Sequence, residues 1–129
     1  MSSLEERARS ARERAYAPYS GFLVGAALET DDGRVFDGCN VENAAYSVTC
    51  CAERVALFTA VAAGARRFRR LVVSAGDRTP FPCGACRQAL AEFAPALPIT
   101  VVTVEGDRHE LELGELLPRP FTFRPEAPA

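Results

Sequence analysis

Two cysteine motifs, each at the start of a predicted helix, constrain this chain more than any other feature of its sequence. Pro82-Cys83-Gly84-Ala85-Cys86 begins one helix, and Cys51-Ala52-Glu53 begins another. A helix N-terminus favours thiolates, because its free N–H groups and its dipole stabilise negative charge. Two such N-termini that meet at one ion would hold it through Cys51, Cys83 and Cys86. We therefore expect a fold that brings these two helix starts together.

The spacing of Cys83 and Cys86 alone leaves three interpretations open: half of a metal site, a redox dithiol, or chance spacing. Cys51 adds a third thiolate, and Glu53 adds a carboxylate two residues further along. A structural zinc site usually closes with a fourth protein ligand, whereas a catalytic zinc keeps that position for water. The set of three cysteines therefore indicates a catalytic Zn²⁺, with Glu53 as the candidate proton carrier beside it.

The other cysteines and the only histidine are not expected to bind this ion. His109 falls in a predicted hairpin strand and is expected on the surface. Cys50 would point about 100° away from Cys51 around a helix, and Cys39 would end a strand in the core. In a reducing compartment, closely spaced cysteines more often bind metals or react than form disulfides.

Composition and charge argue against several classes of function. The 129 residues fit one domain over 1–129, and the net charge of −2 disfavours a nucleic-acid partner. Arg66, Arg67, Arg69 and Arg70 could bind phosphate, but no aromatic residues interleave for base stacking, so a solvated connection is favoured. No apolar run is long enough for a bilayer, and the charged N-terminus is unlike a secretory signal. We expect no membrane partner and a cytoplasmic location.

The pattern of apolar residues and turn signals predicts a layered α/β fold. Helices are predicted over 3–17, 50–63 and 84–93, and strands over 22–29, 34–39, 71–74, 99–104 and 109–113. Ser3 and Glu6 predict a capping box at the first helix. Early antiparallel strands followed by alternating strands and helices predict a five-stranded mixed sheet between helices on both faces, a three-layer α/β/α arrangement.

The two cysteine motifs together match the signature of zinc deaminases in its all-cysteine form. In that chemistry a zinc-activated hydroxide attacks the ring carbon that carries the amino group, and the glutamate transfers protons. Three thiolates leave the Zn²⁺ site with a net negative charge, which raises the pKa of the bound water. Arg54 and Arg87 each follow a ligand and could offset this charge. Our hypothesis is that Arg54 hydrogen-bonds a thiolate sulfur.

Over nearly its whole length the chain resembles the small homotetrameric cytidine deaminases. The shared segments are Tyr16–Phe22, Val24–Leu28, Gly38–Tyr46, Cys51–Arg54, Pro82–Gln88 and Leu116–Phe121. The resemblance implies the cytidine deaminase fold and one zinc per chain. It also implies hydrolytic deamination of cytidine and 2′-deoxycytidine in pyrimidine salvage.

The resemblance also implies how a nucleoside would be bound. Asn40 and Glu42 would bind the ribose hydroxyls, which suits an amide and a carboxylate. Phe22 would pack against the base, and the backbone around Ala52 would recognise the pyrimidine edge. Without the resemblance, the segment that holds Asn40 and Glu42 is predicted only as a polar loop.

Two aromatic residues are implied to act between subunits. Phe121 resembles an aromatic residue that reaches into the pocket of a neighbouring subunit, and Tyr46 resembles a tyrosine at a subunit junction. A homotetramer with shared active sites would then be necessary for activity.

Three alternatives to cytidine deamination stay open at this point. The first is a deaminase of a modified aminopyrimidine nucleoside, like blasticidin-S deaminase, although Asn40 and Glu42 favour a plain ribose. The second is a structural zinc module without an open metal position. The third is a redox protein that forms a Cys83–Cys86 disulfide and binds no metal.

Overall fold

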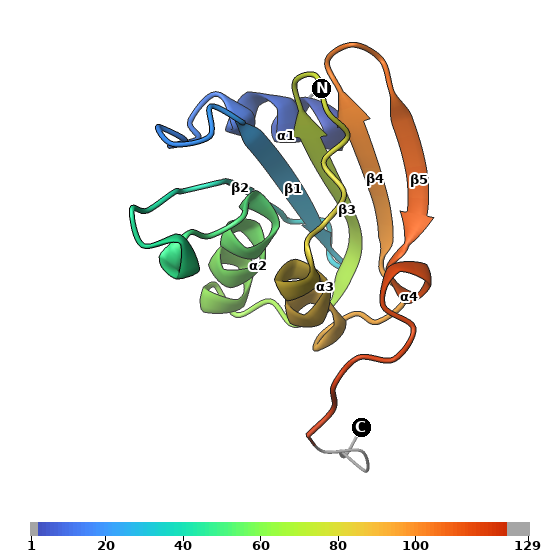
Figure 1. Cartoon of the computed structure of the whole chain (residues 1–129). Helices are drawn as coiled ribbons and strands as arrows, with labels where there is room; N and C mark the ends of the chain where they lie inside the picture. Colours follow the sequence, from blue (N-terminus) through green and yellow to red (C-terminus); the bar gives the residue numbers. More distant parts are fainter. Residues whose placement is uncertain (1–2, 124–129) are drawn as a thin grey trace.

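A five-stranded sheet forms the centre of the protein in a computed structural model that describes residues 3–123 (Figure 1). The strands are β1 (Val24–Thr30), β2 (Val35–Cys39), β3 (Phe68–Ala75), β4 (Pro98–Thr103) and β5 (Arg108–Glu112). Their spatial order is β2-β1-β3-β4-β5. Strands β3 and β4 are parallel, and all other neighbours are antiparallel. The predicted mixed sheet of five strands is therefore confirmed.

Helices cover both faces of the sheet. They are α1 (Leu4–Arg12), α2 (Ala52–Ala62), α3 (Gly84–Ala91) and the short α4 (Leu113–Leu116). Figure 1 shows α2 and α3 in front of the sheet and α1 behind it. Alternate residues of β1 supply the two cores: Leu28 packs on the α2 and α3 side, and Ala27 packs on the α1 side. Within residues 3–123, no helix has the length and apolar character to cross a membrane.

Two glycines allow the helices to lie directly on the sheet backbone. A Cβ atom at Gly38 in β2 would lie 2.5 Å from the amide nitrogen of Ala56 and 2.7 Å from the carbonyl oxygen of Ala52, both in α2. A Cβ atom at Gly25 in β1 would lie 2.0 Å from the carbonyl oxygen of Ala8 in α1. These distances leave no room for a methyl group, so one glycine on each face sets how closely a helix approaches.

The first helix begins where the sequence predicts and ends earlier. Ser3 and Glu6 form the predicted capping box, with the Ser3 Oγ accepting from the Glu6 amide at 3.1 Å. Helix α1 ends at Arg12 instead of residue 17. The reason is that the backbone of Tyr16 hydrogen-bonds residues 40 and 42, at 2.9 and 2.8 Å. A residue that pairs in this way cannot also continue a helix.

Near the C-terminal end of the described chain, two features were not predicted. Helix α4 begins at Leu113, where the sequence predicts the end of a strand, because Glu112 and Glu115 form a second capping box. Further along, the Gln88 side chain in α3 exchanges two hydrogen bonds with the backbone of Phe121, each 3.0 Å long. These bonds hold the segment after α4 beside α3.

Replacing Gly38 with alanine is expected to lower the free energy of unfolding by about 1–3 kcal/mol, because α2 must move away from β2 to admit the methyl group. Urea unfolding followed by circular dichroism measures this change. Gly114→Ala is the matched control, since its Cβ atom would lie 3.3 Å from the end of the flexible Glu112 side chain and at an ordinary contact distance of 3.6 Å from the carbonyl oxygen of Pro95. Equal stability of the two variants would contradict the close packing of α2 on β2.

Candidate metal centre and active-site cavity

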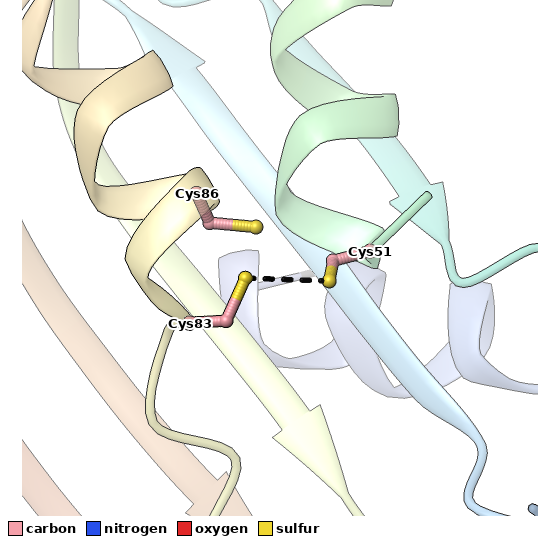
Figure 2. A group of neighbouring side chains, drawn as sticks. All are labelled: Cys51, Cys83 and Cys86. Atoms are coloured by element: carbon pink, nitrogen blue, oxygen red, sulfur yellow. Dashed lines mark hydrogen bonds between the residues drawn. The ribbon is translucent and has the colours of Figure 1, made fainter. Parts of the chain in front are cut away.

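Three cysteines from two helix N-termini converge on one point. Cys51 is the N-cap of α2, Cys83 is the N-cap of α3, and Cys86 lies in the first turn of α3. Figure 2 shows the three thiols pointing toward one another. All three sulfurs lie within 4.8 Å of one another, and the sulfurs of Cys51 and Cys83 are 3.6 Å apart. Thiolates bound at about 2.3 Å to one tetrahedral zinc would have sulfurs about 3.8 Å apart, so the set fits this ion.

The electrostatics of the cluster also favour a cation. Hydrogen bonding with Cys86, and then with Arg54 and Cys83, holds the pKa of the Cys51 thiol well below its ordinary value. The same bond to Cys51, together with burial, raises the pKa of Cys86. Ionisation of one thiol thus opposes ionisation of the next. Three thiolates at this spacing need a positive ion among them. Within residues 3–123, the cluster has no fourth ligand, because no histidine, carboxylate or further cysteine belongs to it.

Two arginines beside the cysteines make different contacts. The Nη2 atom of Arg54 lies 3.6 Å from the Cys51 sulfur, and this hydrogen bond raises the pKa of the Arg54 guanidinium. Its positive charge is therefore held against the cysteine cluster. Arg87 instead donates to the backbone carbonyls of Pro82, at 2.7 Å, and Leu116, at 3.0 Å. Arg87 therefore fixes the segment before α3 and the end of α4.

A cavity of about 220 Å³ opens beside the cysteines, and Cys51 and Cys83 form part of its wall. Five residues that the resemblance places near a substrate or the metal line it as well: Phe22, Asn40, Glu42, Ala52 and Glu53. They come from the segment before β1, the segment after β2 and the first turn of α2. The structure therefore gathers distant segments of the sequence around one cavity.

Glu53 lies in the wall of this cavity with only 4% of its surface exposed. Burial raises the pKa of its carboxyl group to about 7, and the charge of Cys51 acts in the same direction. The backbone N–H of Glu53 itself, in the first turn of α2, and the charge of Arg54 lower this pKa and favour the ionised form. A carboxyl group with a pKa near neutrality can both accept and release a proton at physiological pH.

Asn40 and Glu42 hold the segment before β1 in place as well as lining the cavity. The Asn40 amide donates to the carbonyl oxygen of Phe22 and accepts from the amide of Val24, both at 2.8 Å. Glu42 accepts hydrogen bonds from the backbone and from the hydroxyl of Ser20, which lower the pKa of the Glu42 carboxyl. This structural role was not predictable from the sequence, because the hydrogen-bond partners are about 20 residues away along the chain.

One wall of the cavity was not predicted from the sequence. Pro80 and Phe81, from the segment between β3 and α3, both line it. The ring of Phe81 also contacts His109 on β5, with ring centroids 5.2 Å apart. His109 is exposed, as predicted, and is not part of the cysteine cluster. The position of Phe81 directly before the Pro82-Cys83 motif is the signal that could have identified it.

Three other predicted positions lie outside the cavity in the single chain. Tyr46, in the 3₁₀ turn η1 (Tyr46–Val48), is 78% exposed, and Phe121 is 71% exposed. Cys50 precedes α2 and pairs through its backbone with Val41, so our placement of Cys50 on the helix is wrong. Cys50 nevertheless does not belong to the cysteine cluster.

Comparisons with known proteins give the family. Residues 2–102 match the model of the cytidine and deoxycytidylate deaminase zinc-binding region. A cytidine deaminase from Sporosarcina psychrophila is 48% identical over 124 residues, which cover 95% of this chain and 91% of that protein. The crystal structure of cytidine deaminase from Burkholderia pseudomallei has a TM-score of 0.88 and 51% identity, covering 92% of this chain and 96% of that one. The chain belongs to the cytidine and deoxycytidylate deaminase family, whose members are zinc-binding hydrolases.

A deaminase named for a different substrate is less similar to this chain. Blasticidin-S deaminase from Bacillus cereus is 30% identical over 108 residues, covering 77% of this chain and 76% of that protein. The two cytidine deaminases above have higher identity over a larger part of the chain.

Replacing any of Cys51, Cys83 or Cys86 with alanine is expected to reduce bound zinc from one per chain to less than about a tenth, because each supplies one of only three thiolates. Inductively coupled plasma mass spectrometry of the purified proteins measures the zinc content. Cys50→Ala is the matched control and is expected to keep one zinc per chain. Loss of zinc in Cys50→Ala, with zinc retained in Cys51→Ala, would reverse the assignment of the two adjacent cysteines.

Proposed function

We propose that this protein hydrolyses the amino group of cytidine and 2′-deoxycytidine, giving ammonia and uridine or 2′-deoxyuridine, in cytoplasmic pyrimidine salvage. The observation that carries the proposal is the buried carboxyl group of Glu53 in the same small cavity as the converging cysteines. Membership of the deaminase family, and high identity to cytidine deaminases over nearly the whole chain, support this reaction.

Cys51, Cys83 and Cys86 would hold one zinc ion, which when bound lowers the pKa of a water and supplies the nucleophile for C4 of the pyrimidine. The Glu53 carboxylate accepts the proton that this water loses and delivers it to ring atom N3. Glu53 then takes the second proton from the oxygen now bonded to C4 and passes it to the amino group, so that the C4–N bond breaks, ammonia leaves and a carbonyl remains at C4. Arg54 offsets the negative charge of the three thiolates through its contact with the Cys51 sulfur.

The cavity walls suit a neutral nucleoside. Phe22 packs against the base, and the backbone at Ala52, in the first turn of α2, recognises the pyrimidine edge. After its bond to Phe22, the Asn40 amide keeps one N–H for a ribose hydroxyl, and Glu42 can accept from another. Among the described residues that line the cavity, none is basic. Glu42 would repel a phosphate, so a nucleoside is favoured over a nucleotide.

Replacing Glu53 with glutamine is expected to lower kcat for cytidine by about 10²–10⁴-fold, because the amide cannot carry the proton. Loss of cytidine absorbance measures turnover, and zinc content is measured on the same samples. The variant is expected to keep one zinc per chain, since Glu53 is not a ligand. Full activity in Glu53→Gln would contradict the role of the carboxyl group.

The same assay separates the alternatives. A zinc-replete wild type that turns over neither cytidine nor deoxycytidine would overturn the proposal and favour a structural zinc module. A zinc-free protein with a reducible Cys83–Cys86 disulfide would favour the redox interpretation. A kcat/KM for blasticidin S above that for cytidine would favour the antibiotic deaminases.

Assembly into a homotetramer with shared active sites is part of the proposal. Tyr46 and Phe121 are exposed aromatic residues, a type that is enriched at protein–protein interfaces. A second hollow of about 200 Å³ reaches Tyr46 and shares Ser20, Glu42 and Thr49 with the cavity. A neighbouring subunit at this surface would close the cavity on its open side.

Replacing Phe121 with alanine is expected to lower kcat/KM for cytidine at least about tenfold, because the neighbouring pocket loses an aromatic wall. Analytical ultracentrifugation checks whether the wild type is a tetramer. The matched control is Phe123→Ala, which removes a side chain that is 86% exposed only two residues away. A fully active monomeric wild type would contradict the shared sites.

A further inference from the structure

Three hydrogen bonds fix the backbone around Phe22. The Phe22 amide donates to the Oγ of Ser20 at 2.9 Å, and its carbonyl oxygen accepts from the Asn40 amide at 2.8 Å. The amide of Val24 donates to the other end of the Asn40 side chain, also at 2.8 Å. With the main chain held, the freedom that remains to Phe22 is rotation of its side chain. Contacts of the ring itself therefore decide which way it faces.

Arg78 makes such a contact with the Phe22 ring. It lies in the segment between β3 and α3, and its guanidinium carbon is 4.6 Å from the centroid of the Phe22 ring. Arg78 is exposed, and within residues 3–123 its side chain forms neither a salt bridge nor a hydrogen bond. Stacking on Phe22 is therefore the interaction that orders this arginine.

The segment between β3 and α3, which carries Arg78, also forms part of the cavity wall. Pro80 and Phe81 line the cavity, whereas Arg78 does not. The Arg78 guanidinium therefore contacts the Phe22 ring but does not line the cavity in which a nucleoside would bind. The Phe22 ring also packs against the edge of the core, and a cation attracted to one face of an aromatic ring holds that face toward itself.

We propose that Arg78 is a positioning residue that holds the Phe22 ring in the orientation in which it packs against the pyrimidine. This proposal rests on the proposed function, in which Phe22 contacts the base. A ring that contacts the base in the same way throughout the reaction contributes equally to substrate and transition-state binding. If the Phe22 ring loses its fixed orientation, KM therefore rises and kcat stays largely unchanged.

Steady-state kinetics of the zinc-loaded full-length protein with cytidine test this role. Arg78→Ala is expected to raise KM about threefold to tenfold, which matches a partly exposed cation–π contact, with kcat within about twofold of the wild type. Arg78→Lys keeps the charge and is expected to recover part of the loss, whereas the uncharged Arg78→Met is expected to recover less. Equal effects of Arg78→Lys and Arg78→Ala would overturn the cation–π account.

Arg34→Ala provides a matched control. Arg34 stacks on the Phe36 ring at 5.6 Å, and neither residue lines the cavity. Its loss is expected to leave KM unchanged. A rise in KM as large as that of Arg78→Ala would mean that loss of surface charge, and not the position of the arginine, causes the effect, and would overturn the proposal.

A double-mutant cycle shows whether Arg78 acts through the ring. In a Phe22→Leu background, Arg78→Ala is expected to change KM less than about twofold, because no ring remains to be held. An equal rise in KM in both backgrounds would mean that Arg78 attracts the substrate directly, and would overturn the proposal. An unchanged KM for Arg78→Ala in the wild-type background would also overturn the proposal.

Nuclear magnetic resonance of protein labelled at the phenylalanine rings gives a readout that needs no turnover. Arg78→Ala is expected to shift the ring signals of Phe22 and to spare those of Phe36. Unmoved Phe22 signals would overturn the ring contact. Should the zinc-loaded wild type fail to consume cytidine, the proposed function would fail, and the Phe22 signals would still decide whether Arg78 holds the ring.

Discussion

Three thiol groups whose sulfurs lie within 4.8 Å of one another cannot all ionise unless positive charge lies between or beside them. The protein supplies part of this charge through the N-termini of α2 and α3, which both point at the sulfurs. Arg54 supplies a further part through its contact with Cys51. The remaining part is supplied by zinc, the metal that this family binds. The position of both helices is thus tied to the chemistry of the three sulfurs.

The sheet determines where these helix N-termini can meet. Strand β3 runs parallel to β4, and the segment that follows β3 leads directly into α3. Helix α2 reaches the same end of the sheet because it lies on the backbone of β2 at Gly38. The first turn of α2 carries Glu53, so the approach of this helix to the sheet also places the carboxyl group beside the cysteines. The packing of α2 on the sheet therefore also determines the geometry of the cavity.

Features that leave a recognisable motif or pattern were predictable from the sequence. The Ser3 capping box follows from local spacing, and the mixed sheet follows from the order of strand and helix patterns. The meeting of Cys51 with Cys83 and Cys86 was predictable, although the motifs are far apart, because three thiols at two helix starts match one metal site. Contacts between distant segments that share no motif were not predictable. The early end of α1 depends on the pairing of Tyr16 with residues 40 and 42. The stacking of Arg78 on Phe22 joins residues with no common motif.

The hydrogen bonds of Asn40 and Glu42 have a consequence for enzyme design. Both residues line the cavity, and both also hold the backbone of the segment before β1. Under the proposed function, in which these two residues bind the ribose, a substitution intended to alter sugar preference at either position would also release the segment that carries Phe22. Under that proposal, sugar preference and the position of Phe22 cannot be varied independently. Thr49 lines the same cavity, and its hydroxyl accepts from the amide of Asn43, so a substitution there would disturb the segment that carries Glu42 and not the one that carries Phe22.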